Sequence, residues 1–293
     1  MPAPLQGPLQ SPIHRFVLGA FEVTTIVDGG LQMPIKGPFL LDKDADDIAA
    51  IAQAAYLPAE TTENTFVPTI VNTGRELVLF DTGFGELRRG NGAGYLRERL
   101  GLAGYTPEDI DIVAFTHMHP DHIGGILEGG APAFPNARLM IGRREFDEWN
   151  SGASIPPQRS DNRELFLKLI APLADHFTYL DDGDAVCAGI TAEAAFGHSP
   201  GHMMYRLTSG DQSALVWGDV ANHFVFSVEH PFSPVGFDDD KETAIATRIR
   251  VLEMVAAEGL VVVGHHMPFP SVGYVEQSAH GYRWIPMSYQ MEP

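Results

Sequence analysis

The stretch Thr116-His117-Met118-His119-Pro120-Asp121-His122 places three imidazoles and one carboxylate within six consecutive positions. Side chains of these types bind zinc and related divalent cations. The apolar run 110–115 ahead of them predicts a buried strand, and Gly124-Gly125 predict the start of a helix. On extended backbone His117 and His119 point the same way. Asp121 and His122 lie one turn further on and can reach a second cation. Ligand-type side chains this close together favour a metal site over loop histidines that only face solvent.

Three later segments supply the further ligands that such a site needs. Each places a histidine or an aspartate where an apolar strand or a glycine-flanked turn runs into a loop, the usual position of functional groups on a rigid scaffold. The segments are Gly197-His198-Ser199-Pro200-Gly201-His202, Leu215-Val216-Trp217-Gly218-Asp219 and Leu260-Val261-Val262-Val263-Gly264-His265-His266. Their joint occurrence in this order indicates a metal centre far more specifically than any one of them does.

In these motifs the chain resembles the metallo-β-lactamase superfamily, whose signature is H-x-H-x-D-H followed by a lone His, a lone Asp and a final His. The resemblance runs from about Val67 to His266 and includes Asp81-Thr82-Gly83, which matches the family's D-T-G turn. It implies that Asp219 bridges two cations and that Asp81 orients a ligand histidine. A simple turn aspartate is the alternative for Asp81. The ligand set that the resemblance implies is His117, His119 and His198 for one cation and Asp121, His122 and the final histidine for the other.

Two histidines compete for the final position, because His265 and His266 are adjacent. Many superfamily members have Gly-His here, which would select His265. A narrower group, similar to methyl parathion hydrolase, has His-Leu-Pro-Phe-Pro, and this chain has His266-Met267-Pro268-Phe269-Pro270. We therefore assign His266 as the ligand and leave the role of His265 open. His202, four residues beyond His198, is expected to hydrogen-bond beside the ligands rather than to bind metal.

The residue pattern along the chain predicts strands followed by helices, and then the same order again. Such an order suits two sheets packed face to face with helices outside, the αββα sandwich that the resemblance also implies. We expect an irregular N-terminal arm over 1–15, one catalytic domain over 16–293, and a mobile loop beside the site over 152–162. The predicted strands are 16–28, 65–81, 190–195, 203–208 and 214–217, with another beginning at Phe177, and the predicted helices are 44–56, 95–102, 143–149, 163–173 and 240–257.

Composition excludes some classes of function. The chain of 293 residues is 44% hydrophobic, enough for a sizeable core, and has a net charge of −19. Its 19 lysines and arginines form no basic cluster, which argues against a nucleic-acid partner. No apolar run approaches the roughly 20 residues that would span a membrane. The acidic run Asp238-Asp239-Asp240 is expected to cap the following helix and to stay solvated.

The expected location is the cytoplasm. The N-terminal residues lack the charged region and apolar stretch of a secretory signal, although a trimmed chain could have lost one. The single cysteine, Cys187, excludes an internal disulfide and fits a reducing compartment. Only the family resemblance suggests a homodimer.

Two neighbouring cations predict hydrolysis. A water shared by both loses a proton near neutral pH, and the bridging hydroxide attacks a carbonyl or phosphoryl centre. Asp121 is placed to orient that hydroxide or to carry its proton. Zinc is the expected metal, and a site of this composition also accepts cobalt, manganese or iron.

The resemblance implies a small-molecule substrate, a neutral hydrophobic ester: a lactone, an aryl ester or an organophosphate triester. The expected walls of an apolar pocket are Phe84, Trp149, Phe166 and Phe269. Many acylhomoserine lactonases of the superfamily carry a tyrosine shortly after the bridging aspartate. This chain has Asp219-Val220-Ala221-Asn222-His223 instead, so that Asn222, His223 or the metal alone would have to assist the carbonyl. Acylhomoserine lactones are therefore in doubt as the natural substrate.

Three alternatives remain open. A thioesterase similar to hydroxyacylglutathione hydrolase would need basic residues near its C-terminus, and the tail after His266 offers only Arg283. An iron oxidoreductase would be a persulfide dioxygenase, which usually keeps one iron, or a diiron flavoprotein, which needs a flavin domain that this chain lacks. A binding protein that has lost catalysis would not need all seven ligands.

Overall fold

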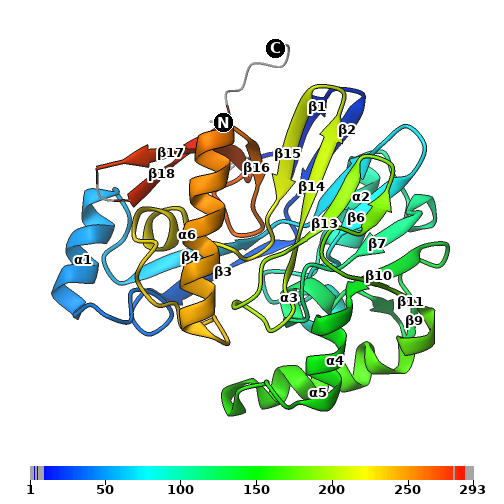
Figure 1. Cartoon of the computed structure of the whole chain (residues 1–293), viewed down its shortest axis with the longest axis horizontal. Helices are drawn as coiled ribbons and strands as arrows, with labels where there is room; N and C mark the ends of the chain where they lie inside the picture. The colour runs from blue at the N-terminus through cyan, green and yellow to red at the C-terminus, as the bar shows by residue number, and fades with distance from the viewer. Residues whose placement is uncertain (1–2, 4, 6–9, 280, 288–293) are drawn as a thin grey trace.

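Two seven-stranded sheets face each other in the computed structural model, which describes residues 3, 5, 10–279 and 281–287 (Figure 1). In spatial order, the first sheet contains β1 (Ile13–Leu18), β2 (Phe21–Ile26), β5 (Thr69–Asn72), β6 (Leu77–Phe80), β7 (Ile112–Ala114), β10 (Arg138–Gly142) and β11 (Phe177–Leu180). The second contains β12 (Ala185–Cys187), β13 (Ile190–Ala194), β14 (Met203–Ser209), β15 (Gln212–Val216), β16 (Val261–Val263), β17 (Val272–Ser278) and β18 (Gly281–Pro286).

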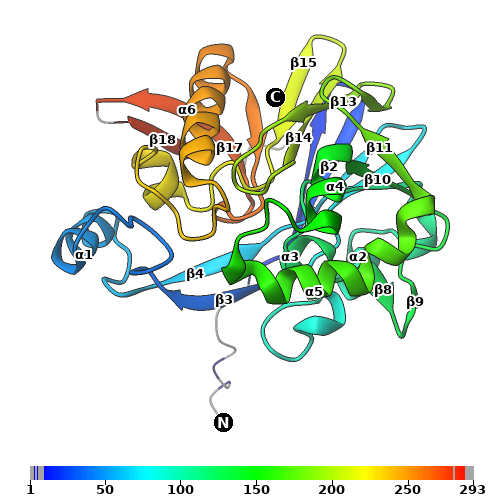
Figure 2. The same ribbon diagram turned by 60° about the horizontal axis from the view of Figure 1, so that its bottom comes forward.

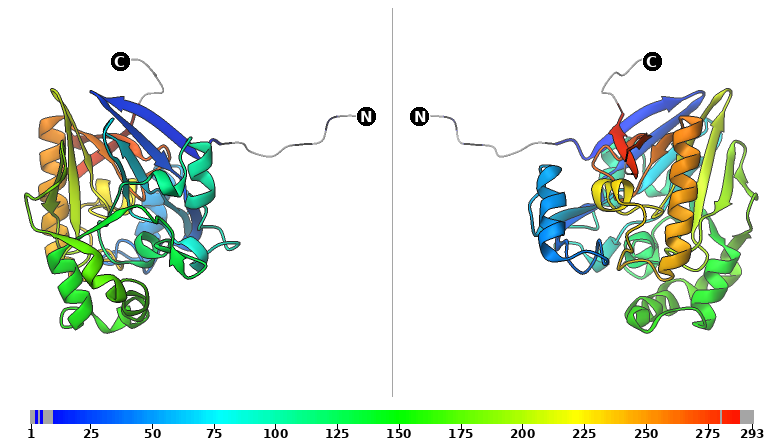
Figure 3. Two further views of the ribbon diagram at one scale, coloured as in Figure 1. Left: turned by 90° about the vertical axis from the view of Figure 1, so that its right-hand side faces the viewer. Right: turned by 60° about the vertical axis from the view of Figure 1, so that its left-hand side comes forward.

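Helices cover the outer faces of both sheets, which confirms the predicted αββα sandwich (Figure 3). On the side of the first sheet lie α2 (Leu96–Leu102), α4 (Arg143–Ser151) and α5 (Ser160–Leu169). The long α6 (Lys241–Glu258) packs on the second sheet. The two remaining α-helices are α1 (Ala45–Ala54) and the short α3 (Pro120–Ile123), and Phe224–Glu229 forms a π-helical segment. No helix in the described part of the chain is both long and apolar enough to cross a membrane.

Three apolar layers hold the sandwich together. Strand β7 shows how, since successive side chains of a strand face opposite ways. Its Val113 packs under the helices of the first sheet, while Ile112 and Ala114 pack between the sheets against residues such as Leu207 and Val263. A third layer lies between the second sheet and α6. Because β7 is buried on both faces, it appears in the sequence as an unbroken apolar run.

A two-stranded ribbon leaves the sandwich and was not predicted as such. Strand β3 (Gly29–Pro34) pairs antiparallel with β4 (Thr61–Phe66), and the ribbon runs to α1 (Figure 2). Alternate side chains give it two different faces. A second small pair, β8 (Leu127–Glu128) with β9 (Ala131–Pro132), follows the predicted metal loop.

Several local predictions differ from the structure. The helix expected to start at Gly124 is not found there: the short α3 starts at Pro120, which occupies its first helical position, and ends at Ile123. The strand expected over 16–28 is a hairpin that turns at Gly19, whose φ of +59° favours glycine. It begins at Ile13, within the predicted arm, much of which lies outside the described residues. The start of the 163–173 helix moves to Ser160 in α5.

The prediction that the acidic run 238–240 stays solvated is wrong for two of its three residues. Asp240 caps α6 by accepting from the Thr243 backbone N–H at 3.1 Å. Asp238 is only 1% exposed, and the side chain of Asp239 is 3% exposed. Both carboxylates turn inward, toward the predicted metal site.

The order of the strands brings the four predicted ligand segments to one edge. Strands β6 and β7 are parallel, as are β15 and β16, so that their carboxyl ends point the same way. The loops that follow them carry Asp81, the stretch 116–122, Asp219 and the stretch 264–266. The loop from β13 to β14, which carries the stretch 197–202, lies at the same edge. Loops at this end of a sheet are where binding groups are commonly placed.

Candidate metal centre

Three buried imidazoles meet in a first group, formed by His117, His119 and His198. The Nδ1 atom of His119 lies 3.0 Å from the Nε2 atom of His117 and 3.0 Å from the Nε2 atom of His198. The rings stand nearly perpendicular to one another. Three nitrogen atoms thus converge from different directions, which is the arrangement that three ligands take around one cation.

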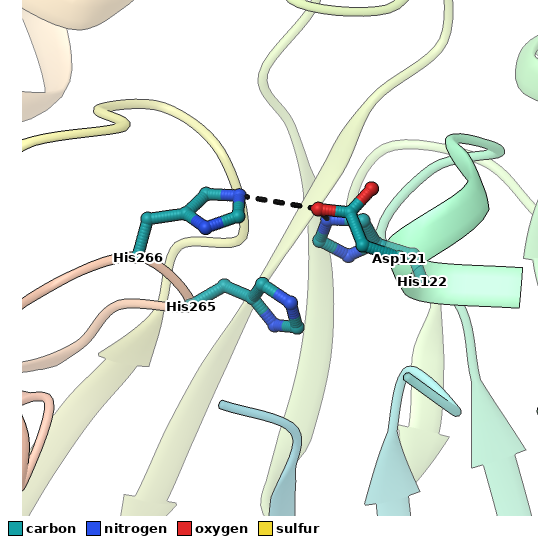
Figure 4. Close-up of side chains that lie close together, drawn as sticks. All are labelled: Asp121, His122, His265 and His266. Carbon is teal, nitrogen blue, oxygen red and sulfur yellow. Dashed lines mark ion pairs between the residues drawn. The ribbon is translucent and has the colours of Figure 1, made fainter. Parts of the chain in front are cut away.

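A second group contains Asp121, His122, His265 and His266 (Figure 4). The Oδ2 atom of Asp121 lies 3.5 Å from the Nε2 atom of His122 and 3.5 Å from the Nε2 atom of His266. Asp121 comes from α3, and the two adjacent histidines come from the loop after β16. Imidazole and carboxylate together again suit a divalent cation.

Asp219 lies between the two groups. Its Oδ2 atom is 3.2 Å from the Nε2 atom of His198, which belongs to the first group, and 2.9 Å from that of His266, which belongs to the second. Its Oδ1 atom is 3.4 Å from the Nε2 atom of His122. One carboxylate therefore faces both groups, as the bridging position requires.

The adjacent histidines take different environments. The ring of His266 reaches both carboxylates, Asp121 and Asp219, through its Nε2 atom, and its Nδ1 atom lies 2.8 Å from the carbonyl oxygen of Thr65. The ring of His265 lies 4.1 Å from that of His122, centroid to centroid, and its buried Nε2 atom has no hydrogen-bond partner among the described residues. We keep His266 as the proposed ligand, because it alone of the two makes ion-pair contacts with both carboxylates.

Unpartnered polar atoms at the centre fit metal ions. The Nε2 atom of His122 and the Oδ1 atom of Asp219 are buried without a hydrogen-bond partner within the described ranges. Buried polar groups are rarely left in that condition, because each costs free energy. Divalent cations would satisfy both atoms, so that these residues fit a pair of such ions.

The ligand imidazoles are held from behind. Asp81 accepts from the Thr116 backbone N–H at 2.8 Å, and its Oδ2 atom lies 2.8 Å from the Nδ1 atom of His122. This is the contact expected of a carboxylate that orients a ligand. The Oγ1 atom of Thr116 lies 3.0 Å from the Nδ1 atom of His117. Partners of this kind fix the orientation of the ring and the nitrogen that is free to bind metal.

Asp238 and Asp239 do the same for the first group, and the sequence did not reveal them. The Oδ1 atom of Asp238 lies 2.9 Å from the Nδ1 atom of His198, and the Oδ2 atom of Asp239 lies 3.5 Å from the Nε2 atom of His119. Asp239 also pairs with the guanidinium of Arg159 at 2.8 Å. The only available signal was the position of the acidic run ahead of α6, which a solvated cap explains equally well.

Glu145 joins the two loops that carry the first group. This fully buried carboxylate, on α4, accepts from the backbone N–H groups of Met118 at 2.9 Å and Gly201 at 2.7 Å. It also accepts from the Ser199 hydroxyl at 2.5 Å, and the indole of Trp149 donates to the same hydroxyl at 2.9 Å. The sequence analysis missed Glu145, since a lone glutamate in an amphipathic helix resembles a surface residue.

His202 lies behind Asp219. Its ring is fully buried, and its Nε2 atom accepts from the backbone N–H of Asp219 at 3.0 Å. It belongs to none of the groups that could hold a cation among the described residues. Its position fits the proposal that it supports the bridging aspartate.

The surroundings of the histidines at the centre shift their pKa values in opposite directions. Burial and nearby Arg159 together lower the pKa of His119 to about 4, although Asp239 acts in the opposite direction. Burial also disfavours protonated His198, but Asp219 and Asp238 outweigh it and raise the pKa of His198 to about 9. At neutral pH the metal-free centre therefore holds a proton on His198, which lies beside Asp219 and Asp238, and leaves His119 neutral.

A cavity of about 530 Å³ opens above the two groups. Its floor includes His119, Asp121, Asp219 and His266, and its apolar walls come largely from one face of the β3–β4 ribbon and from the segments around Phe84 and Phe237. The lining also contains Leu31, Met33, Asn64, Phe66, Leu87, Arg88, Pro120, Arg159, Asn162 and Asn222. Arg159 comes from the 152–162 segment, which therefore lies beside the site.

Of the four aromatic residues expected as walls, Phe84 lines this cavity and the other three do not. Trp149 and Phe166 are fully buried in the layer between the first sheet and its helices. Phe269 is half-buried and lies outside the lining. The ring of Phe84 packs edge-on against that of Phe66, which also lines the cavity, with 4.7 Å between the ring centroids.

The two candidates for assisting a carbonyl also differ. The carboxamide of Asn222 lines the cavity and donates to the Oδ2 atom of Asp219 at 3.0 Å. His223 faces away, with Nδ1 accepting from the backbone N–H groups of Val225 and Phe226 and Nε2 lying 3.1 Å from the Thr62 hydroxyl. Both ring nitrogens of His223 are thus engaged, so that Asn222 or the metal alone would have to assist the carbonyl.

Comparisons with known proteins agree with this geometry. The family model of the metallo-beta-lactamase superfamily matches residues 67–276, more than half of the chain. An N-acyl homoserine lactonase of Bacillus cereus is 25% identical over 174 residues, which cover 57% of this chain and 60% of that protein. The N-acyl homoserine lactonase AiiA of Bacillus thuringiensis subsp. kurstaki is 26% identical over 177 residues, with the same coverage. The match thus spans about 60% of the length of these relatives.

Two solved structures resemble the whole molecule. AidC, a dizinc quorum-quenching lactonase solved with a product, has a TM-score of 0.89, covers 95% of this chain and 98% of its own, and is 24% identical. The hydrolase AbOPH, described as a member of the beta-lactamase superfamily, has a TM-score of 0.88, covers 97% of this chain and 100% of its own, and is 26% identical. The similarity to AidC, at 24% identity, concerns the fold alone.

Proposed function

Since this chain belongs to the metallo-β-lactamase superfamily, we propose that it is a metal-dependent hydrolase that opens lactones and cleaves related neutral esters. We propose that it uses two divalent cations and that these are zinc. The observation that carries the proposal is the position of Asp219. It faces two separate groups of histidine and aspartate ligands at the floor of a cavity with apolar walls. The relatives named as lactonases support the choice of substrate.

Two bound cations would supply Lewis acidity and lower the pKa of water at the site. The side chains do the rest. Asp121 is the proposed catalytic acid and base, because its carboxylate is the most exposed of the ligand side chains, at 15%, and lines the cavity. It can orient an attacking water and pass its proton to the leaving oxygen. His122 and His266 hold that carboxylate in place from two sides.

Two amides are available to the carbonyl of the substrate. Asn222 keeps one N–H on Asp219 and lines the cavity with its carboxamide. Asn64 lies on the cavity face of β4 and is only 8% exposed. A donor in a water-poor site stabilises the charge that develops on a carbonyl oxygen. We propose that Asn222 acts there in place of the tyrosine that this chain lacks.

The cavity favours neutral, partly hydrophobic substrates. Leu31, Met33 and Phe66 form one wall from the ribbon, and Phe84 and Phe237 face the space from other segments. Lactones with an acyl chain, including N-acyl homoserine lactones, fit such walls, and so do aryl esters and phosphotriesters. Two arginines, Arg88 and Arg159, also line the cavity, although Asp239 pairs with Arg159. A thioesterase acting on an anionic glutathione conjugate is therefore the alternative to test.

The deciding experiment combines metal analysis with a substrate panel. The purified chain should contain two divalent cations, zinc being the expected metal. It should hydrolyse dihydrocoumarin, an acylhomoserine lactone or a p-nitrophenyl ester faster than methyl paraoxon. Lactoylglutathione belongs in the same panel. Turnover of lactoylglutathione alone would overturn the substrate proposal, and full activity without bound metal would overturn the mechanism.

The proposed setting is a homodimer in the cytoplasm. Cys187 is a free thiol in the structure, which suits a reducing compartment. Sedimentation analysis of the purified chain and fractionation of cells test the two statements separately.

A further inference from the structure

One arginine is completely buried behind the metal centre. Arg248 lies on α6, is 0% exposed, and donates its Nη2 hydrogen to the Oδ2 atom of Asp238 at 2.7 Å. Its Nε donates to the carbonyl of Val220 at 3.2 Å. Its Nη1 donates to the carbonyls of Pro231 at 3.2 Å and Ser233 at 3.1 Å. A single guanidinium thus ties α6 to two separate loops.

Both loops lead to proposed ligands. Asp238 uses one carboxylate oxygen for Arg248 and places the other 2.9 Å from the Nδ1 atom of His198. Val220 directly follows Asp219, so that the carbonyl held by Arg248 belongs to the residue beside the bridging carboxylate. His198 and Asp219 are themselves 3.2 Å apart. Arg248 therefore fixes the two proposed ligands relative to each other from behind.

A contribution to fold stability alone is a poor explanation of this arrangement. Removing a guanidinium and a carboxylate from water costs free energy that their attraction only partly returns, and well-packed apolar residues often serve as well or better. Metal affinity, by contrast, depends on how the ligand imidazole is oriented by its partner. The fork of an arginine can hold several acceptors in a fixed plane, which a lysine cannot.

We propose that Arg248 is a positioning residue of the metal centre, which acts through Asp238 on His198 and through the Val220 carbonyl on Asp219. This inference rests on the proposed function, because it presupposes that the two groups bind cations. Arg248 touches no substrate; its effect is on the affinity and geometry of the cation held by His117, His119 and His198.

Four variants separate positioning from simple support of the fold. R248M keeps the length of the side chain without its donors, R248K keeps the charge without the fork, and D238N keeps the volume of the partner. R250M is the matched control, because Arg250 lies on the same helix, is exposed, and bonds only to the carbonyl of Ala194 among the described residues. For each chain the measurements are the unfolding midpoint of the metal-free form, the affinity for zinc against a chromophoric chelator, and the absorption spectrum after cobalt substitution.

We expect R248M and D238N to bind one of the two cations roughly 10–100-fold more weakly than the wild type. Their cobalt spectra should change, R248K should fall between R248M and the wild type, and R250M should match the wild type. R248M with wild-type zinc affinity and cobalt spectrum would overturn the positioning role. If R248M does not fold, R248K decides by the same two measurements. A wild-type chain that binds no cation would overturn the proposed function itself, which distinguishes the two failures.

Discussion

Asp219 and His266 lie 2.9 Å apart, carboxylate oxygen to ring nitrogen, although 47 residues separate them in the sequence. The same carboxylate lies 3.2 Å from His198, which belongs to the other group of ligands. No other side chain in the described part of the chain makes ion-pair contacts with imidazoles of both groups. Asp219 therefore joins the two groups into one centre.

Replacing Asp219 by alanine should disturb both cations at once. The D219A variant is expected to lose more than the roughly 10–100-fold in metal affinity that removal of a supporting residue costs, because it removes a ligand of both sites. Elemental analysis after gel filtration and the rate of lactone hydrolysis measure the two effects. The exposed Asp211, replaced by alanine, is a suitable control. Unchanged metal content in D219A would contradict the bridging assignment.

The adjacent histidines give a second prediction. H266A should lose metal and activity severely, because the Nε2 atom of His266 contacts both Asp121 and Asp219. H265A should be mild, because the ring of His265 contacts the ring of His122 and makes no ion pair with a carboxylate among the described residues. Metal content and kcat of the two variants decide. The reverse order would move the final ligand by one residue.

The sequence singled out the proposed ligands, which the structure brings together, and two of the side chains behind them, Asp81 and His202, but it did not reveal Asp238, Asp239 or Glu145. The ligands between His117 and His122 can be recognised in the sequence, because one short motif contains several ligand types. Asp238 cannot, because its burial depends on Arg248, ten residues later, and on His198 from another loop. No local sequence pattern shows that a buried carboxylate will find partners on distant segments of the chain. Trp149 fails for a related reason: an aromatic residue on an amphipathic helix can face a cavity or a core, and only packing decides.

The walls of the cavity can be tested through Phe84. F84A should raise the KM for a lactone with a long acyl chain roughly 10-fold, as expected for the loss of an apolar contact. Metal content should not change, because Phe84 contacts Phe66 and Arg88 rather than a ligand. F269A should leave KM unaltered, since that ring lies outside the cavity. Equal effects of the two variants would mean that the substrate binds elsewhere.

Metal binding should release protons at neutral pH. Asp219 and Asp238 overcome the effect of burial and raise the pKa of His198 to about 9, so that its ring is protonated in the metal-free chain at pH 7. A cation needs the neutral imidazole and must displace that proton. Affinity should therefore rise as the pH rises from 7 toward 9. Calorimetry in buffers with different heats of ionisation counts the protons, and a count of zero would contradict the prediction.

The protonation of Glu145 should make the stability of the fold depend on pH. Burial raises the pKa of this carboxyl to about 7, although three hydrogen bonds from Ser199, Gly201 and Met118 favour its ionised form. The folded chain then holds the proton more tightly than the unfolded chain, whose carboxyl has a pKa near the model-compound value of 4.5. The stabilisation is complete below the unfolded pKa and is lost as the pH rises through the folded pKa.

Comparison with the E145Q variant isolates this contribution, because glutamine does not titrate. The free energy of unfolding of the metal-free wild type, relative to that of E145Q, should fall by about 3 kcal/mol between pH 4.5 and pH 8. Urea denaturation of both chains at a series of pH values gives the difference directly, and the other titrating groups largely cancel. A difference that stays constant would mean that folding leaves the pKa of Glu145 unchanged, so that its three donors offset its burial.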